Sequence, residues 1–132
     1  MENVLFVCVE NAGRSQMAES FFRKYAPAKF NVISAGTTPS SQLNPTVVQV
    51  MKEVGIDMMQ QSPKTLSNEM IEKSSKTVNM GCMDRESCPA LFVKDVLDWN
   101  ISDPKGKSID DIREIRDQIL KKVLQLIESI EK

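Results

Sequence analysis

The sequence predicts an α/β fold, a three-layer arrangement in which a four-stranded parallel sheet carries helices on both faces. Segments with the apolar pattern of buried strands alternate along the chain with segments of helical periodicity, as in parallel sheets with helical crossovers. A length of 132 residues suits one domain with one buried core, and we expect residues 1–132 to form it.

Four elements are expected in the first half of the chain. An apolar run indicates the first strand, and helical spacing that stops before Pro27 indicates the first helix. β-branched residues closed by Gly36 indicate the second strand. The second helix begins where Asn44 can cap it and Pro45 suits its first position, and it ends at Gly55. In chain order these elements cover residues 3–8, 15–25, 30–34 and 45–54.

Four further elements are expected in the second half. A short helix follows the cap signal at Ser67, and two strand-like stretches come after it. The chain then closes with a long amphipathic helix, whose isoleucine, valine and leucine residues recur at helical spacing. In chain order the predicted elements are a helix at 67–72, a strand at 76–80, a strand within 93–99 and a helix at 108–131.

The composition narrows the class of protein. Hydrophobic residues at 41% and charged residues at 27% are ordinary for a soluble globular protein, and a net charge of −1 gives no reason to expect a nucleic acid or a membrane as partner. No apolar run approaches the length of about 20 residues that spans a bilayer, and no signal peptide is evident, so we expect a cytoplasmic protein. Three cysteines in that reducing compartment favour catalysis or metal binding over structural disulfides.

The most informative stretch is the loop between the first strand and the first helix. It starts at Cys8, closes on Arg14 and Ser15, and contains Asn11 and Gly13, which tolerate the backbone angles of a tight turn. A strand that feeds a tight loop opening a helix directs several backbone N–H groups at one point. The stretch therefore predicts an oxyanion site with a thiol at its floor.

The chemistry available to Cys8 follows from what surrounds it. The chain has no histidine, so a Cys–His pair or a Ser–His–Asp triad is excluded. Activation of the thiolate must come from the loop amides, the helix dipole, Arg14 and the Ser15 hydroxyl. The guanidinium of Arg14 would also offer a bidentate fork to the oxyanion. The alternative is a buried, inert core cysteine beside an arginine on the helix surface.

The chain resembles the low-molecular-weight protein tyrosine phosphatases and, more closely, the arsenate reductases that share their fold. The resemblance rests on Cys-x5-Arg-Ser after the N-terminal strand, on its continuation through Gln16-Met17-Ala18-Glu19, and on segments further along the chain. These segments are Ser34-Ala35-Gly36, Asn44-Pro45, Asp103-Pro104-Lys105-Gly106 and the two downstream cysteines. The similarity covers essentially the whole chain and implies the phosphatase-like fold, with a phosphate loop after the first strand.

The resemblance implies a role for each residue of the site. Cys8 is the nucleophile, Arg14 holds the oxyanion, and Asp103 is the general acid that protonates the departing oxygen. An anion nearby favours the neutral form of such a carboxyl group, although Asp-Pro-x-Gly taken alone is more often just a turn. The oxyanion-binding residues are Val9, Glu10, Asn11, Ala12, Gly13, Arg14 and Ser15.

The family's reductases also hold a cation near this loop, with groups that match Asn11, Glu19 and Ser34. A carboxylate expected later in the chain is replaced by Lys64. We infer that the Lys64 ammonium takes the place of the metal ion against Glu19, and we therefore expect no bound metal and no effect of potassium. The alternative is an exposed loop lysine. Ser15 completes the set of residues expected to support the loop.

Cys82 and Cys88 form a second group that follows the third predicted strand. A disulfide requires Cα atoms about 4.4–6.8 Å apart, whereas residues six apart in a helix are separated by about 9 Å of axial rise. If the segment between Gly81 and Pro89 is helical when reduced, the two cysteines can bond only after it unwinds, and we expect such a redox-driven change. The alternatives are unremarkable loop cysteines or a metal site, for which the chain has too few ligands. The resemblance implies a relay of electrons through Cys8, Cys82 and Cys88.

The predicted function is the reduction of arsenate, with phosphate or sulfate as competing oxyanions. No tightly bound cofactor is expected; the resemblance implies thioredoxin as the reductant, and a glutaredoxin-type carrier or a small thiol stays open. The alternative is a phosphatase that uses Cys8, Arg14 and Asp103 on phosphomonoesters. Against it, Lys105 and Gly106 stand where tyrosine phosphatases of this fold carry two aromatic residues. A third hypothesis is a redox or arsenic sensor that is oxidised without turnover.

Overall fold

The computed structural model describes residues 2–80 and 96–131, in which four parallel strands form one sheet. Their order across the sheet is β2-β1-β3-β4, so the N-terminal strand lies inside it. The register pairs Cys8 at the end of β1 with Gly36 at the end of β2, and Val7 with Asn79 at the end of β3. The carboxyl ends of these strands therefore meet at one edge. The strands are β1 (Glu2–Cys8), β2 (Phe30–Gly36), β3 (Lys76–Asn79) and β4 (Val96–Asp98).

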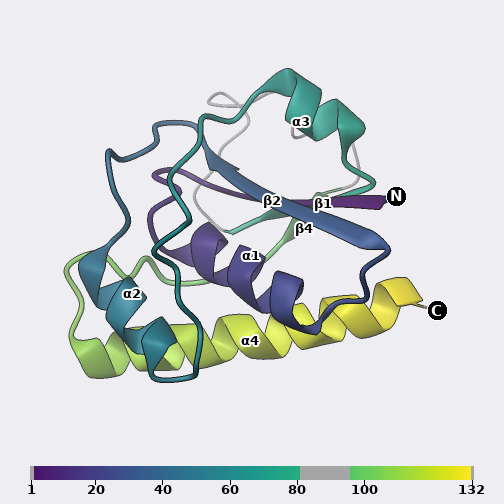
Figure 1. Cartoon of the computed structure of the whole chain (residues 1–132). Helices are drawn as coiled ribbons and strands as arrows, with labels where there is room; N and C mark the ends of the chain where they lie inside the picture. Colours follow the sequence, from purple (N-terminus) through teal and green to yellow (C-terminus); the bar gives the residue numbers. More distant parts are fainter. Residues whose placement is uncertain (1, 81–95, 132) are drawn as a thin grey trace.

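Helices cover both faces of this sheet, unequally (Figure 1). Three of them, α1, α2 and α4, pack together on one face, and the short α3 lies on the other. Side chains of β1 alternate between the two layers, because successive residues of a strand point to opposite faces. Phe6 and Cys8 belong to the larger core, and Leu5 and Val7 to the smaller one. The helices are α1 (Arg14–Tyr25), α2 (Pro45–Lys52), α3 (Asn68–Lys73) and α4 (Ile109–Glu131). The predicted fold class is confirmed.

Local capping signals account for where the helices begin. The Asn44 side chain accepts hydrogen bonds from the Thr46 and Val47 amides at 3.0 and 3.4 Å, and Ser67 accepts one from the Met70 amide at 3.2 Å. Helix α2 ends at Lys52, before the predicted end. The chain that follows forms i→i−3 hydrogen bonds, from the Val54 amide to Met51 and from the Gly55 amide to Lys52, in place of the i→i−4 bonds of an α-helix. Strand β4 occupies Val96–Asp98 of the predicted 93–99, and residues 93–95 lie outside the described part of the chain.

An aromatic row crosses the larger core. The Phe6 ring lies 6.1 Å from that of Phe22 and 5.6 Å from that of Trp99, and Phe22 is 6.2 Å from Phe30. These contacts anchor β1 against α1, and through Trp99 they also anchor the chain that leaves β4. Within the described residues, no helix is long and apolar enough to cross a membrane.

Candidate active site

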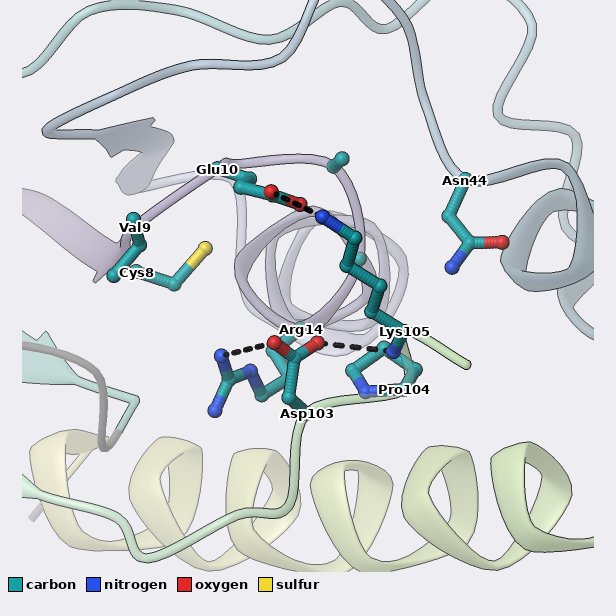
Figure 2. Close-up of a pocket in the computed structure, with 10 residues that line it drawn as sticks. Cys8, Val9, Glu10, Arg14, Asn44, Asp103, Pro104 and Lys105 are labelled. Atoms are coloured by element: carbon teal, nitrogen blue, oxygen red, sulfur yellow. Dashed lines mark hydrogen bonds and ion pairs between the residues drawn. The ribbon is translucent and has the colours of Figure 1, made fainter. Parts of the chain in front are cut away.

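A pocket of about 430 Å³ opens at the carboxyl end of β1, in front of the N-terminus of α1 (Figure 2). Two loops face each other across it. The oxyanion loop, residues 8–15, forms the floor, and the acid loop, residues 103–106, forms the opposite wall. The lining residues are Cys8, Val9, Glu10, Ala12, Gly13, Arg14, Asn44, Asp103, Pro104 and Lys105. Open α/β sheets bind ligands at this position.

The oxyanion loop turns its backbone N–H groups inward. The carbonyl groups of Val9, Glu10 and Ala12 accept hydrogen bonds at 2.9 Å from amides of the chain between β2 and α2. In a trans peptide the carbonyl and the following N–H point in opposite directions, so the next amides are directed at the pocket. Arg14 is the first residue of α1, and the positive end of the helix dipole adds to this field.

The Cys8 thiol sits at the floor and is 3% exposed. Its Sγ lies 2.8 Å from Ser15 Oγ and accepts a hydrogen bond from the Asn11 amide at 3.2 Å. The sulfur therefore has a hydroxyl and a backbone N–H within hydrogen-bond distance at the floor of the pocket. Cys8 thus lines the pocket with polar partners, unlike a cysteine enclosed only by apolar side chains.

Arg14 is buried, contrary to the alternative of a surface helix residue. Its Nη1 donates to the Ile101 carbonyl at 2.9 Å and to the Met80 carbonyl at 3.3 Å. Its Nη2 lies 3.6 Å from Asp103 Oδ2. The guanidinium is thus fixed in the lining of the pocket. It lies next to the carboxylate of Asp103, the predicted general acid.

Asn11 holds the loop together from inside. It is fully buried and has φ +52°, a left-handed backbone conformation that asparagine tolerates better than most residues. Its Nδ2 donates to Ser15 Oγ at 2.7 Å and to Ser34 Oγ at 3.0 Å. Its Oδ1 accepts from Gln16 Nε2 at 2.9 Å and from the Lys64 amide at 2.8 Å. The loop is therefore braced by β2, by α1 and by the chain after α2.

Gly13 is glycine for a different reason from the predicted one. Its φ of −141° lies outside the left-handed region, so the turn does not need it there. Instead, a Cβ at this position would meet Pro104 Cγ at 2.8 Å. Gly13 lets the proline ring of the acid loop pack directly against the oxyanion loop.

Behind the loop, Glu19 is buried and receives three partners. Ser34 Oγ donates to its Oε1 at 2.9 Å, Lys64 Nζ lies 3.6 Å from the same oxygen, and Arg23 Nη2 lies 3.1 Å from Oε2. Lys64 Nζ also donates to the Ser62 carbonyl at 3.1 Å, and its proposed role in place of a metal ion stays a prediction. Arg23 was not anticipated, although its i,i+4 spacing from Glu19 is a signal for such a pair. No cluster of three or more metal-ligating side chains occurs in residues 2–80 and 96–131.

Two further contacts were not anticipated from the sequence. Gln16 is fully buried and its Nε2 donates to the Asn11 backbone carbonyl at 3.0 Å as well as to its side chain. At the mouth of the pocket, Lys105 Nζ lies 3.1 Å from Glu10 Oε1. The sequence offered no signal for this pair, because the two residues lie in distant segments.

The predicted partner cysteines, Cys82 and Cys88, lie outside the described residues, as does the predicted rearrangement of their segment. The last described residue before them, Met80, lies beside the pocket. Its amide donates to the Val7 carbonyl at 2.9 Å, and its carbonyl accepts from Arg14.

Comparison with known proteins agrees with this geometry. Residues 3–132 match the family described as low molecular weight phosphotyrosine protein phosphatase. The glutaredoxin arsenate reductase of Synechocystis is 33% identical over 131 residues, 98% of this chain and 99% of that protein. The thioredoxin-dependent arsenate reductase of Corynebacterium glutamicum superimposes with a TM-score of 0.83 at 36% identity, over 99% of this chain and 62% of that one. The YwlE arginine phosphatase of Geobacillus stearothermophilus superimposes with a TM-score of 0.87 at 26% identity, over 99% of this chain and 94% of that one. The chain therefore belongs to the low molecular weight phosphotyrosine protein phosphatase family.

Proposed function

We propose that this protein is an arsenate reductase. The observation that carries the proposal is the Cys8 thiol, held by a hydroxyl and an amide at the floor of an anion pocket that contains a buried arginine. The similarity to proteins named arsenate reductase, over nearly the full length of the chain, favours arsenate over a phosphoester as the substrate.

In the first step the Cys8 thiolate attacks the arsenic atom of arsenate, which is held by Arg14 and the loop amides. Asp103 gives a proton to the departing oxygen, which leaves as water. Asp103 Oδ2 lies 3.6 Å from Arg14 Nη2, so an oxyanion held by Arg14 lies next to this carboxyl group.

In the second step Cys82 attacks the sulfur of Cys8. The S–As bond breaks, arsenic takes its electron pair and leaves as arsenite, and a Cys8–Cys82 disulfide remains. Cys88 then attacks Cys82, which releases the Cys8 thiolate and moves the disulfide to Cys82–Cys88. A dithiol carrier reduces this pair. The roles of Cys82 and Cys88 rest on the family resemblance alone.

We propose thioredoxin as the carrier, on the strength of the Corynebacterium enzyme, and a cytoplasmic location, where such carriers keep thiols reduced. A glutaredoxin is the alternative carrier, because the Synechocystis relative is named for it.

The test is NADPH consumption in the presence of arsenate, thioredoxin and thioredoxin reductase. Wild type, Cys8→Ser, Cys82→Ser and Cys88→Ser are compared, and glutathione with glutaredoxin replaces thioredoxin in a parallel series. Turnover that is lost in all three variants supports the relay. Turnover only in the parallel series keeps the reductase and changes the carrier.

A phosphatase is the second candidate, because the arginine phosphatase neighbour has the same fold and the same pocket groups could act on a phosphoester. Hydrolysis of an aryl phosphate that requires Cys8 but ignores Cys82→Ser and Cys88→Ser, without arsenate-dependent NADPH consumption, would establish it. Stoichiometric oxidation of the thiols without turnover would instead favour the sensor.

A further inference from the structure

One ion pair joins the two loops at the entrance of the pocket. Lys105 Nζ donates to Glu10 Oε1 at 3.1 Å. Figure 2 shows the lysine side chain reaching from the acid loop across the pocket to the oxyanion loop, in front of the N-terminus of α1. The side chains of Glu10 and Lys105 are 38% and 70% exposed, so the pair lies at the mouth and not at the floor.

The backbone beneath this pair is fixed on both sides. Pro104 packs on Gly13, at the distance that excludes a Cβ there, and the Lys105 amide donates to Asp103 Oδ1 at 3.0 Å. On the other side, the Glu10 carbonyl accepts from the Ser40 amide at 2.9 Å. The backbone positions from which the two side chains extend are therefore held by contacts of their own.

The two charges of the pair have opposite effects on an approaching anion. The Glu10 carboxylate at the entrance would repel a doubly charged oxyanion, because water and salt screen charges within one pocket only in part. Lys105 offsets that charge. If an oxyanion binds at the floor of the pocket, the organic part of an ester bound to the same groups would leave through the mouth, where these two side chains lie.

We propose that Glu10 and Lys105 form a strap that makes the pocket selective for inorganic oxyanions over phosphoesters and their analogues. The proposal deepens the proposed function and rests on it for the location of the oxyanion. It assigns the selectivity to side chains of this chain that are not needed for the chemical steps.

The test measures binding, not turnover. Alkylation of Cys8 by iodoacetamide is followed by mass spectrometry of the peptide that contains it, and the protection given by inorganic phosphate or by phenylphosphonate yields an apparent Kd for each. Phenylphosphonate has no bond that the site can hydrolyse. Because both ligands are dianions, the ratio of the two Kd values cancels the effect of a changed charge and isolates the effect of the strap.

The variants are Lys105→Met and Glu10→Gln, with Lys107→Met as the matched control. Lys107 is an exposed lysine close by that does not line the pocket. We expect the ratio of the phenylphosphonate Kd to the phosphate Kd to fall about two- to fivefold in both strap variants, the range set by an exposed ion pair, and to stay unchanged in the control. The phosphate Kd itself should rise in Lys105→Met and fall in Glu10→Gln.

Exchange of the two charges, Glu10→Lys together with Lys105→Glu, should restore the wild-type ratio. A ratio that is the same in wild type and both single variants would overturn the strap, and so would a lowered ratio that the exchange does not restore. Loss of arsenate reduction in the wild type would overturn the proposed function only, because the protection assay does not depend on turnover.

Discussion

Replacing Asn11 with alanine tests whether the oxyanion loop is held in shape by its own buried hydrogen bonds. The change removes two donors and two acceptor contacts that reach Ser15, Ser34, Gln16 and the backbone of Lys64. It also leaves alanine at a backbone φ of +52°, which is unfavourable for a residue with a Cβ.

The expected cost follows from these contacts. The partly buried amide of Lys64 loses its acceptor, at about 1–3 kcal/mol, and the other three bonds contribute about 0.5–1.5 kcal/mol each. The left-handed backbone adds about 1–2 kcal/mol for alanine. Because water can enter the space that is left, the low ends of these ranges apply, and we expect the free energy of unfolding to fall by about 3.5 kcal/mol.

Urea unfolding followed by circular dichroism measures this loss. Asn11→Gly removes the same hydrogen bonds without the backbone strain, so it should cost about 1 kcal/mol less than Asn11→Ala. Asn31→Ala is the matched control: that side chain is exposed, and its loss should change stability by less than about 0.5 kcal/mol. A loss below about 1.5 kcal/mol for Asn11→Ala, or a glycine variant less stable than the alanine variant, would refute the reasoning.

Three further predictions concern other parts of the molecule. Gly36→Ala places a Cβ against the backbone of the oxyanion loop, so we expect a loss of about 3 kcal/mol in urea unfolding and a loss of Cys8-dependent activity; a stable, active variant would contradict this. Hydrogen bonds from Arg113 lower the pKa of Glu53, so the contribution of this group to stability is present above its ordinary pKa of 4.5 and disappears as the pH falls through the lowered pKa. The urea midpoints of wild type and Glu53→Gln should therefore differ at neutral pH and converge in acid, and a gap that widens in acid would reverse the sign. Lys64 Nζ lies 3.6 Å from Glu19 Oε1; if its ammonium group takes the place of a metal ion there, initial rates of arsenate reduction should be equal in potassium and sodium salts, and stimulation by potassium would contradict that role.

The features that local sequence signals predict are those decided by a few neighbouring residues. The strand–loop–helix unit around Cys8 follows from an apolar run, a helical period and residues that tolerate a tight turn. Asn44 and Ser67 cap the helices that they were expected to cap, because a cap depends on a side chain and amides two or three positions away. The left-handed conformation of Asn11 has the same local origin.

The contacts that sequence reasoning missed join segments that only the folded chain brings together. Gly13 reads locally as a turn residue, and its actual constraint comes from Pro104 on the other side of the pocket. The Glu10–Lys105 pair and the burial of Gln16 likewise depend on how the acid loop and the chain after α2 approach the oxyanion loop. Residue type and spacing along the sequence do not indicate which distant segments come into contact in this way.

The position of Trp99 has a practical consequence. It is the one tryptophan of the chain, it is 7% exposed, and its ring lies against Phe6. Two residues later, the Ile101 carbonyl accepts the hydrogen bond from Arg14. Trp99 thus belongs to the segment that joins β4 to the acid loop, and its buried indole ring packs against β1, so its emission should change when solvent reaches this part of the core. The intrinsic tryptophan fluorescence of the protein would therefore report both global unfolding and movements of the pocket wall, without an attached dye.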